Sequence, residues 1–131
     1  AFRINEEAPK NLVAKLGSIL DDLGRNLEES KILLLGISYK KNIKDIRNSS
    51  AVRVFTELYE KGINVKFYDP LVDEIRIKGE SICGIFNEHQ LINGLPQFDM
   101  VVVMVDHDGL DYYEIKRNSN IYINTRRSEF N

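Results

Sequence analysis

The sequence has few of the residues that hold small domains together covalently. There is one cysteine among 131 residues, and tryptophan is absent. A single cysteine excludes an internal disulfide and suits a reducing compartment. No apolar run approaches the roughly 20 residues that a membrane-spanning helix needs, and the N-terminus lacks the basic start and apolar stretch of a signal peptide. We therefore expect a cytoplasmic chain that does not associate with membranes.

A large excess of one charge is also lacking. Lys and Arg number 18 and Asp and Glu number 20, so the formal net charge is -2. This balance argues against a nucleic-acid partner, because such proteins need a broad basic face. The hydrophobic share of 43% and the charged share of 29% are ordinary for a globular protein. The length fits one domain with a packed core.

The first predicted element is a helix over residues 6–24. Apolar side chains recur at helical spacing, with Pro9 in the first turn and Gly24 at the end. The chain starts at Ala1 without methionine and enters this helix almost at once, which is expected of a piece of a longer protein and equally of a processed chain. The apolar stripe consists of Leu12, Leu16, Ile19, Leu20 and Leu23.

Strands and helices then alternate, after a polar linker over residues 25–30. Residues 31–35 form an apolar run typical of a strand that is buried on both faces. Ser49 is a suitable N-cap for the next helix, and residues 64–68 form a second strand. Strand, helix and strand in this order form a βαβ unit, whose two strands are parallel. The apolar stripe of the helix consists of Ala51, Val54, Phe55 and Leu58.

Three later segments also have strand character, at residues 81–86, 100–105 and 120–124. Short helices are predicted at residues 87–94 and 110–117. The alternation predicts the α/β class, as a doubly wound, Rossmann-like parallel sheet with a strand order of about 3-2-1-4-5. The leading N-terminal helix would pack outside this sheet or lead in from another domain.

Positive charge is concentrated in the loop over residues 36–49. Loops after parallel strands share one edge of the sheet, where ligands bind. This loop also leads into a helix N-terminus, whose free N–H groups favour an anion. Phosphate suits these features, although lysines in a surface loop are usually just solvated. The basic residues are Lys40, Lys41, Lys44 and Arg47.

A second basic pair, Arg126 and Arg127, follows the last predicted strand. In the predicted order, strands 1 and 5 flank strand 4 and lie about 10 Å apart. A diphosphate with its attached groups can bridge that gap, and the planar fork of arginine matches phosphate oxygens. The first loop has only Gly36 and lacks the repeated glycines of a dinucleotide fingerprint, so NAD is not expected to bind to this domain alone.

Together these motifs resemble the C-terminal, UDP-binding domain of the UDP-glucose/GDP-mannose dehydrogenase family. That family has Gly-x-x-(Phe/Tyr)-Lys and then Asp-x-Arg-x-Ser at the start of a helix, as at residues 36–40 and 45–49 here. Tyr-Asp-Pro at residues 68–70 and Arg126 are further family marks. The resemblance covers essentially the whole chain.

The resemblance implies a role for several residues. Tyr39 and Lys40 are expected to contact UDP, with the ring beside the nucleotide and the ammonium on a phosphate. Arg126 is expected to reach the diphosphate or the sugar. Arg47 is expected to reach the NAD bound to another domain, across the cleft. Asp45 either orients Arg47 or Lys40 or is simply a carboxylate at a helix start.

Other details separate this chain from parts of the family. Val-Asp-His at residues 105–107 is similar to members that oxidise UDP-N-acetyl-mannosamine or UDP-N-acetyl-glucosamine, whereas many UDP-glucose enzymes have Thr-Glu-Trp there. Asn124 stands where the family usually has an aspartate, two residues before Arg126. Asn48 stands where glutamate is common.

The resemblance also implies what the chain leaves to other domains. Residues 1–25 would be a helix that connects to a central domain, and residues 26–131 the UDP-binding domain. The family oxidises a primary alcohol twice, with NAD, through a thioester on the cysteine of a Gly-Ser-Cys motif. That motif does not occur here, so the chain alone is expected to be inactive. Cys83, between apolar residues, is expected to be a buried and inert small hydrophobe.

The expected parent is an NAD-dependent UDP-sugar 6-dehydrogenase for surface polysaccharide synthesis, paired as a homodimer through its central domain. Its substrate would be a UDP-N-acetylhexosamine or UDP-glucose. No metal site is expected, because His107 and its neighbours Asp106 and Asp108 cannot all face one ion. His89 is expected to be exposed.

Two alternatives belong to another class. A receiver-like regulatory module needs acidic residues after its first strand to hold magnesium, and residues 38–41 are Ser-Tyr-Lys-Lys instead. A freestanding nucleotide-binding module without catalysis is left open by the sequence.

Overall fold

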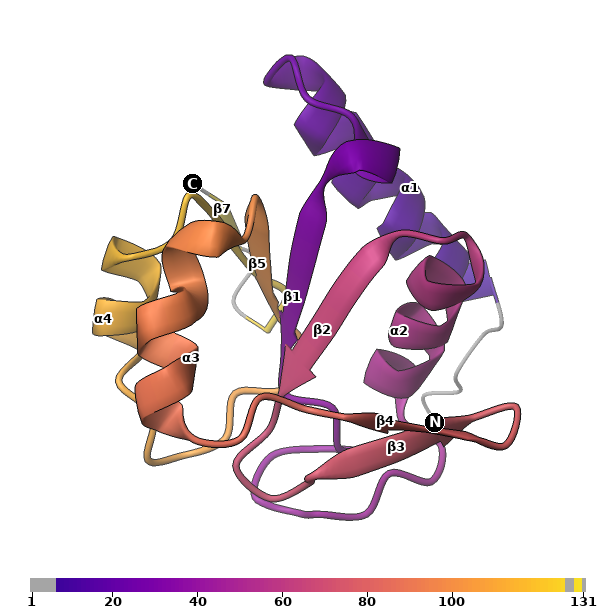
Figure 1. Ribbon diagram of the computed structural model, residues 1–131, viewed down its shortest axis with the longest axis vertical. Coiled ribbons are helices and arrows are strands. Elements are labelled where there is room, and N and C mark those ends of the chain that lie inside the picture. Colours follow the sequence, from indigo (N-terminus) through magenta and orange to yellow (C-terminus); the bar gives the residue numbers. More distant parts are fainter. Residues whose placement is uncertain (1–6, 127–128, 131) are drawn as a thin grey trace.

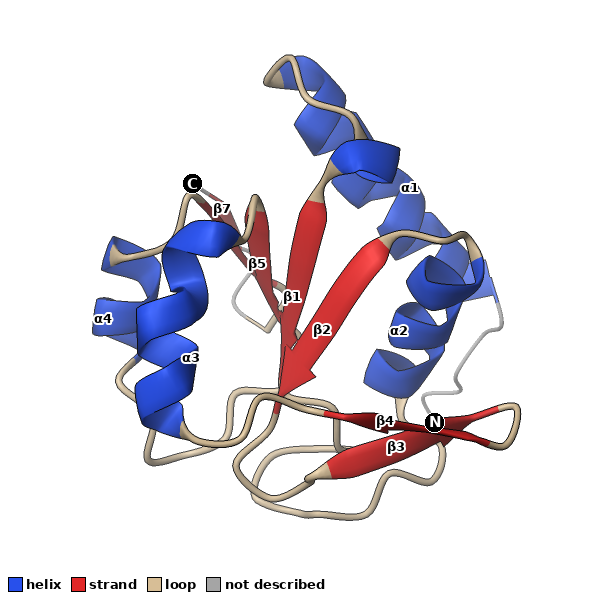
Figure 2. Ribbon diagram, in the orientation of Figure 1, coloured by secondary structure: helices blue, strands red, loops and turns tan. Residues whose placement is uncertain are grey.

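The computed structural model describes residues 7–126 and 129–130 and has three layers (Figures 1 and 2). A five-stranded sheet lies between α1 and α2 on one face and α3 and α4 on the other. Within this part of the chain, no helix is both long and apolar enough to cross a membrane. The helices are α1 (Glu7–Asp22), α2 (Ser50–Glu60), α3 (Glu88–Gly94) and α4 (Tyr112–Arg117), with short 3-10 helices at Leu27–Glu29 and Leu95–Gln97. The strands are β1 (Lys31–Leu35), β2 (Asn64–Tyr68), β3 (Glu74–Ile77), β4 (Glu80–Cys83), β5 (Met100–Val103), β6 (Ile121–Asn124) and β7 (Glu129–Phe130).

The sheet has the order β2-β1-β5-β6-β7. The first four strands are parallel, and β7 pairs antiparallel with β6 at the edge. The predicted doubly wound parallel sheet is confirmed, and so is the order 2-1-4-5 of its four principal strands. Consequently the loops after β1, β2, β5 and β6 all lie at one edge of the sheet.

The predicted third strand does not join this sheet. Glu80–Cys83 instead pairs antiparallel with Glu74–Ile77 in a separate hairpin. The physical reason is the turn between them, where Lys78 has a φ of 51° and Gly79 a φ of 82°. Two consecutive positive φ values match the two-residue turn that reverses a chain within a hairpin. The sequence prediction of strand 3 at the sheet edge is therefore wrong.

The hairpin also corrects the prediction for Cys83, whose side chain is exposed rather than buried. Successive side chains of a strand point to opposite faces. In β4, Ile82 packs partly against the core, so Ser81 and Cys83 on either side of it face solvent.

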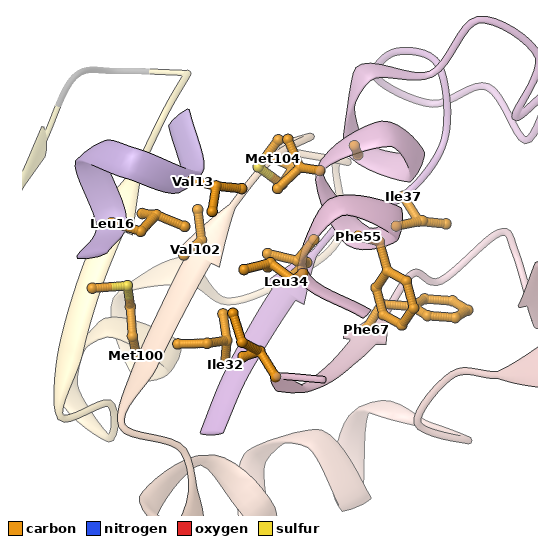
Figure 3. Close-up of a cluster of buried hydrophobic side chains, with 14 of the residues drawn as sticks. Val13, Leu16, Ile32, Leu34, Ile37, Phe55, Phe67, Met100, Val102 and Met104 are labelled. Atoms are coloured by element: carbon orange, nitrogen blue, oxygen red, sulfur yellow. The ribbon is translucent and has the colours of Figure 1, made fainter. Parts of the chain in front are cut away.

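The central strand β1 is buried on both faces, as its apolar run predicts. Ile32 and Leu34 contribute to the core beneath α1 and α2, and Leu33 and Leu35 contribute to the core beneath α3 and α4. Figure 3 shows the first of these two clusters. Burying each such side chain stabilises the fold by about 1.5–3 kcal/mol relative to leaving it exposed.

The leading helix α1 belongs to the first cluster. Leu16 and Leu20 are fully buried there, while Leu23, which the periodicity places in the same stripe, is 55% exposed just after the helix ends. The helix α2 has the predicted core stripe, all four residues of which are buried. Ser49 caps α2 as predicted, since its hydroxyl accepts a hydrogen bond from the Val52 N–H.

Candidate functional site

The loop over residues 36–49 is called the basic loop below. It begins with a sharp turn beside Val105, which follows β5. Gly36 has a φ of 87°, and a Cβ on it would lie 2.3 Å from the carbonyl oxygen of Val105. Its N–H donates to the carbonyl of Tyr68 at 2.8 Å. Only glycine fits both this left-handed conformation and this close approach.

The far end of the basic loop is held by Ser49. Its buried hydroxyl donates to the carbonyl of Ile37 at 2.7 Å while it caps α2. In between, the Tyr39 N–H donates to the carbonyl of Asp45 at 2.7 Å and closes the loop on itself. The cationic side chains are thus carried by a folded segment at the N-terminus of α2.

A buried polar cluster lies under the basic loop. It consists of Ser38, Asp69 and His107, which follow the adjacent strands β1, β2 and β5. Oδ2 of Asp69 accepts from the backbone N–H groups of Ile37 at 2.7 Å and Ser38 at 3.1 Å, and it lies 2.9 Å from Nε2 of His107. Oδ1 of the same carboxylate accepts from the Leu71 N–H at 2.8 Å.

This cluster was not predicted as a unit from the sequence. The sequence identified the Tyr-Asp-Pro motif and His107 as family marks without giving either a structural role. The available signal was three polar residues just beyond the carboxyl ends of three strands that were predicted to be neighbours. His107 is 1% exposed, so its side chain does not reach a ligand on the surface.

The predicted UDP-contacting residues Tyr39 and Lys40 lie at the exposed rim of the basic loop. The Tyr39 side chain is 48% exposed, and Nζ of Lys40 lies 5.9 Å from the centre of its ring. The neighbouring Lys41 pairs with Asp108 at 3.2 Å. Two contacts lower the pKa of Asp108. The larger effect comes from the hydrogen bond from Asn42, and the next from this contact with Lys41.

Of the two cations that Asp45 was expected to orient, it pairs with Arg47. Nη2 of Arg47 donates to Oδ2 of Asp45 at 2.8 Å, and its backbone N–H donates to Oδ1 at 2.8 Å. These hydrogen bonds lower the pKa of Asp45 to about 2 and raise the pKa of Arg47. The Arg47 side chain is 86% exposed, so its guanidinium is accessible while it is held by Asp45.

Arg126 follows β6 at the same edge of the sheet. The strands β1 and β6 flank β5, as predicted, so Arg126 and the basic loop stand on either side of the loop after β5. Nε of Arg126 lies 4.0 Å from Oδ1 of Asp106. Its backbone N–H donates to Oδ1 of Asn124 at 2.9 Å, so the asparagine at the family's aspartate position still orients the turn. Arg127 lies outside the described residues.

The structure also bears on the second histidine and on metal binding. His89 is exposed on α3, as predicted. Residues 7–126 and 129–130 contain no group of three or more His, Cys, Asp or Glu side chains placed to hold a metal ion.

A cavity of about 410 Å³ opens beside Lys41, between the loop after β5 and α4, and it is lined by polar and aromatic side chains.

The fold is that of a Rossmann-like α/β domain, and cationic side chains gather at the carboxyl edge of its sheet. The chain matches the UDP-glucose/GDP-mannose dehydrogenase family, UDP binding domain, over residues 33–128. It therefore belongs to the UDP-glucose/GDP-mannose dehydrogenase family and corresponds to the UDP-binding domain of its members.

Named relatives give the same family. A UDP-N-acetyl-D-mannosamine dehydrogenase of Methanococcus vannielii is 30% identical over 108 residues, which are 82% of this chain and 23% of the relative. A UDP-glucose 6-dehydrogenase of Rickettsia prowazekii is 37% identical over 70 residues, which are 53% of this chain and 15% of the relative. The chain thus spans about a quarter or less of the length of these curated relatives.

Solved structures show the same fold. The structure of a UDP-D-ManNAc dehydrogenase from Pyrococcus horikoshii matches with a TM-score of 0.68 at 24% identity, over 92% of this chain and 27% of that one. A UDP-N-acetyl-mannosamine dehydrogenase from Staphylococcus aureus matches with a TM-score of 0.66 at 22% identity, over 95% of this chain and 28% of that one.

Proposed function

We propose that this chain is the UDP-sugar-binding domain of an NAD-dependent nucleotide-sugar 6-dehydrogenase that oxidises a UDP-N-acetylhexosamine or UDP-glucose to the uronic acid. Residues 26–131 form that domain, and residues 1–25 connect it to a central domain. The observation that carries the proposal is the folded basic loop at the carboxyl edge of the sheet, in a chain of this family.

The diphosphate contacts come from two directions. Lys40 is available from the basic loop, since no carboxylate within the described part of the chain lies within ion-pair distance of its ammonium, whereas Lys41 is paired with Asp108. Arg126 is available from beyond β6, because its 4.0 Å contact with Asp106 is too long for a hydrogen bond. Tyr39 offers an exposed ring beside Lys40 for the nucleoside.

Catalysis is supplied by other domains of the parent. NAD bound there would supply the hydride acceptor, and Arg47 of this domain, with its guanidinium oriented by Asp45, would contact it. This chain has no Gly-Ser-Cys motif and no repeated-glycine fingerprint, and its only cysteine is Cys83. It is inactive alone and acts by holding the UDP end, which positions the sugar for reaction. The parent is a cytoplasmic homodimer that serves surface polysaccharide synthesis.

Support for an N-acetylhexosamine comes from the Val-Asp-His motif at residues 105–107 and from relatives named for such substrates. One of these is a UDP-N-acetyl-D-glucosamine 6-dehydrogenase of Salmonella typhi, 30% identical over 105 residues, 80% of this chain and 24% of the relative.

Calorimetric titration with UDP, UMP and uridine tests the proposal. UDP is expected to bind most tightly and uridine most weakly, with affinity falling as salt rises. Lys40→Ala and Arg126→Ala should each weaken UDP binding by about 10–100-fold, since a charged hydrogen bond contributes about 1.5–3 kcal/mol. Equal, weak binding of all three compounds would contradict phosphate recognition.

Matched controls lie at the opposite edge of the sheet. Lys61 follows the C-terminal end of α2, one helix length from the basic loop, and pairs there with Glu57. Arg117 ends α4 and stacks on Tyr113. Lys61→Ala and Arg117→Ala remove the same charges and should leave UDP binding unchanged.

Finding a Gly-Ser-Cys motif and a dinucleotide fingerprint in the parent gene would separate the dehydrogenase from a freestanding nucleotide-binding module.

A further inference from the structure

His107 is a buried histidine in the loop after β5 that contacts the loops after β1 and β2, and the proposed function leaves it without a role. Its ring lies under the basic loop, beside Asp69 from the loop after β2 and Ser38 from the basic loop itself. The Tyr112 hydroxyl from α4 donates to the His107 carbonyl at 2.6 Å and holds its backbone.

The hydrogen bonds assign the proton on the imidazole ring. The backbone N–H of Asn42 donates to Nδ1 of His107 at 2.8 Å, so Nδ1 must carry a lone pair and no hydrogen. The hydrogen of the neutral ring is then on Nε2, which faces Oδ2 of Asp69 at 2.9 Å and Oγ of Ser38 at 3.0 Å. Ser38 can accept there because its own hydroxyl hydrogen goes to the carbonyl of Lys40 at 3.1 Å.

The two ring nitrogens therefore hold the chain on both sides of Lys41. On one side, Nε2 contacts the Ser38 hydroxyl, which in turn donates to the carbonyl of Lys40. On the other side, Nδ1 accepts directly from the amide of Asn42. The Asn42 side chain adds a reciprocal pair with Asp108, donating to its Oδ2 at 2.8 Å and accepting from its backbone N–H at 3.0 Å. Asn42 has a φ of 63°, a left-handed conformation that asparagine adopts more readily than most residues, and these contacts fix it there.

We propose that His107, as the neutral imidazole with its hydrogen on Nε2, is a positioning residue that holds residues 40–42 in the conformation that binds a nucleoside diphosphate. The inference rests on the proposed function for its ligand, but its geometric part concerns the chain alone. It also gives the Val-Asp-His motif a physical meaning, because the histidine acts on the loop that carries Lys40 and not on the sugar.

Protonation of His107 at Nδ1 removes the acceptor that the Asn42 amide uses. The charged or titratable groups around the ring are the Asp69 carboxylate from the loop after β2, Asp106 and Asp108 on either side along the chain, and the Tyr112 hydroxyl from α4. From the basic loop, the ring faces Ser38 and the Asn42 amide, and Lys41 is turned to Asp108. A hydrogen on Nδ1 would therefore release the Asn42 amide and loosen residues 40–42.

Two substitutions separate the two halves of the ring. The amide nitrogen of glutamine takes about the place of Nε2, and the side-chain oxygen of asparagine takes about the place of Nδ1. His107→Gln keeps the donor to Asp69 and loses the acceptor for Asn42, whereas His107→Asn does the reverse. His89→Gln, on the exposed histidine of α3, is the matched control.

The experiment combines ¹⁵N NMR of the histidine rings, amide hydrogen exchange and UDP titration. In the unmodified chain the ring should show a protonated Nε2 and a bare Nδ1, and the Asn42 amide should be protected. His107→Gln should speed exchange of the Asn42 amide and weaken UDP binding, each by about tenfold. His107→Asn should keep that amide protected, and His89→Gln should change nothing.

Several results would overturn the inference. They are a ring protonated on Nδ1, equal loosening of Asn42 in both His107 variants, or unchanged exchange and UDP affinity in a folded His107→Gln. If His107→Gln does not fold, the unmodified chain decides, since its ring must carry the hydrogen on Nε2 and its Asn42 amide must be protected from exchange. If the unmodified chain fails to bind UDP, the proposed function fails, while the tautomer and the Asn42 exchange still judge the positioning role.

Discussion

The guanidinium of Arg47 donates to both carboxylate oxygens of Asp45, with Nε at 3.1 Å from each oxygen. The two residues are two positions apart, at the point where the basic loop approaches α2. The pair holds an exposed arginine in one direction without burying it. An arginine prepared in this way loses less conformational freedom when it binds an anionic group.

The Asp45–Arg47 pair predicts an unusually acidic carboxyl titration. The pKa of Asp45 is lowered from 3.8 to about 2, chiefly by the side-chain hydrogen bond from Arg47. Because the folded-state pKa lies below the unfolded value, the pair stabilises the fold above pH 3.8 and loses this effect as the pH falls toward 2. Carboxyl-detected NMR should show a midpoint near 2, and Arg47→Ala should return it toward 3.8. An unchanged midpoint in that variant would show that the arginine is not the cause.

Gly36→Ala should be strongly destabilising. The added Cβ meets the Val105 carbonyl oxygen at 2.3 Å in a left-handed conformation. Left-handed strain of about 1–2 kcal/mol and overpacking of about 1–3 kcal/mol predict a loss of about 2–5 kcal/mol in the free energy of unfolding. Urea denaturation measures it. Gly62→Ala is the control, since its φ of 79° is similar but nothing lies within 4 Å of the new Cβ. Equal losses at the two positions would argue against the close approach.

Ser49→Ala should affect stability and UDP binding together. The substitution removes the cap of α2 and the hydrogen bond to the Ile37 carbonyl, for a loss of about 1–2 kcal/mol in the free energy of unfolding. Because the basic loop ends at this residue, UDP affinity should also fall. Asn87→Ala removes the comparable cap of α3, which is outside the basic loop, and should lower stability alone. Thermal denaturation and UDP titration of both variants make the comparison.

Asp69→Asn should cost about 3 kcal/mol in the free energy of unfolding. The carboxylate accepts from three backbone N–H groups and from His107, and an amide must turn its NH₂ toward one of these donors. Asp73→Asn changes an exposed carboxylate a few residues later and should cost less than about 0.5 kcal/mol. Chemical denaturation of the two variants tests this, and a small loss for Asp69→Asn would mean that the cluster relaxes around the amide.

The strands and helices with strong local patterns followed from the sequence. Residues 31–35 and 100–103 contain short apolar runs with no alternation, and their length is typical of a strand that is buried on both faces. Ser49 before an apolar stripe at helical spacing located the start of α2 for the same local reason. The hairpin of β3 and β4 escaped prediction because a strand's partner depends on its turn, and Lys78 does not signal a left-handed conformation.

By itself, the sequence determined the α/β class, the family and the basic loop at the carboxyl edge, because hydrophobic periodicity and contiguous motifs are local properties of the chain. Only the tertiary structure decided that Asp45 holds Arg47 and that His107 holds the amide of Asn42. The second contact joins residues 65 positions apart, and it forms because parallel pairing brings the ends of β1 and β5 side by side.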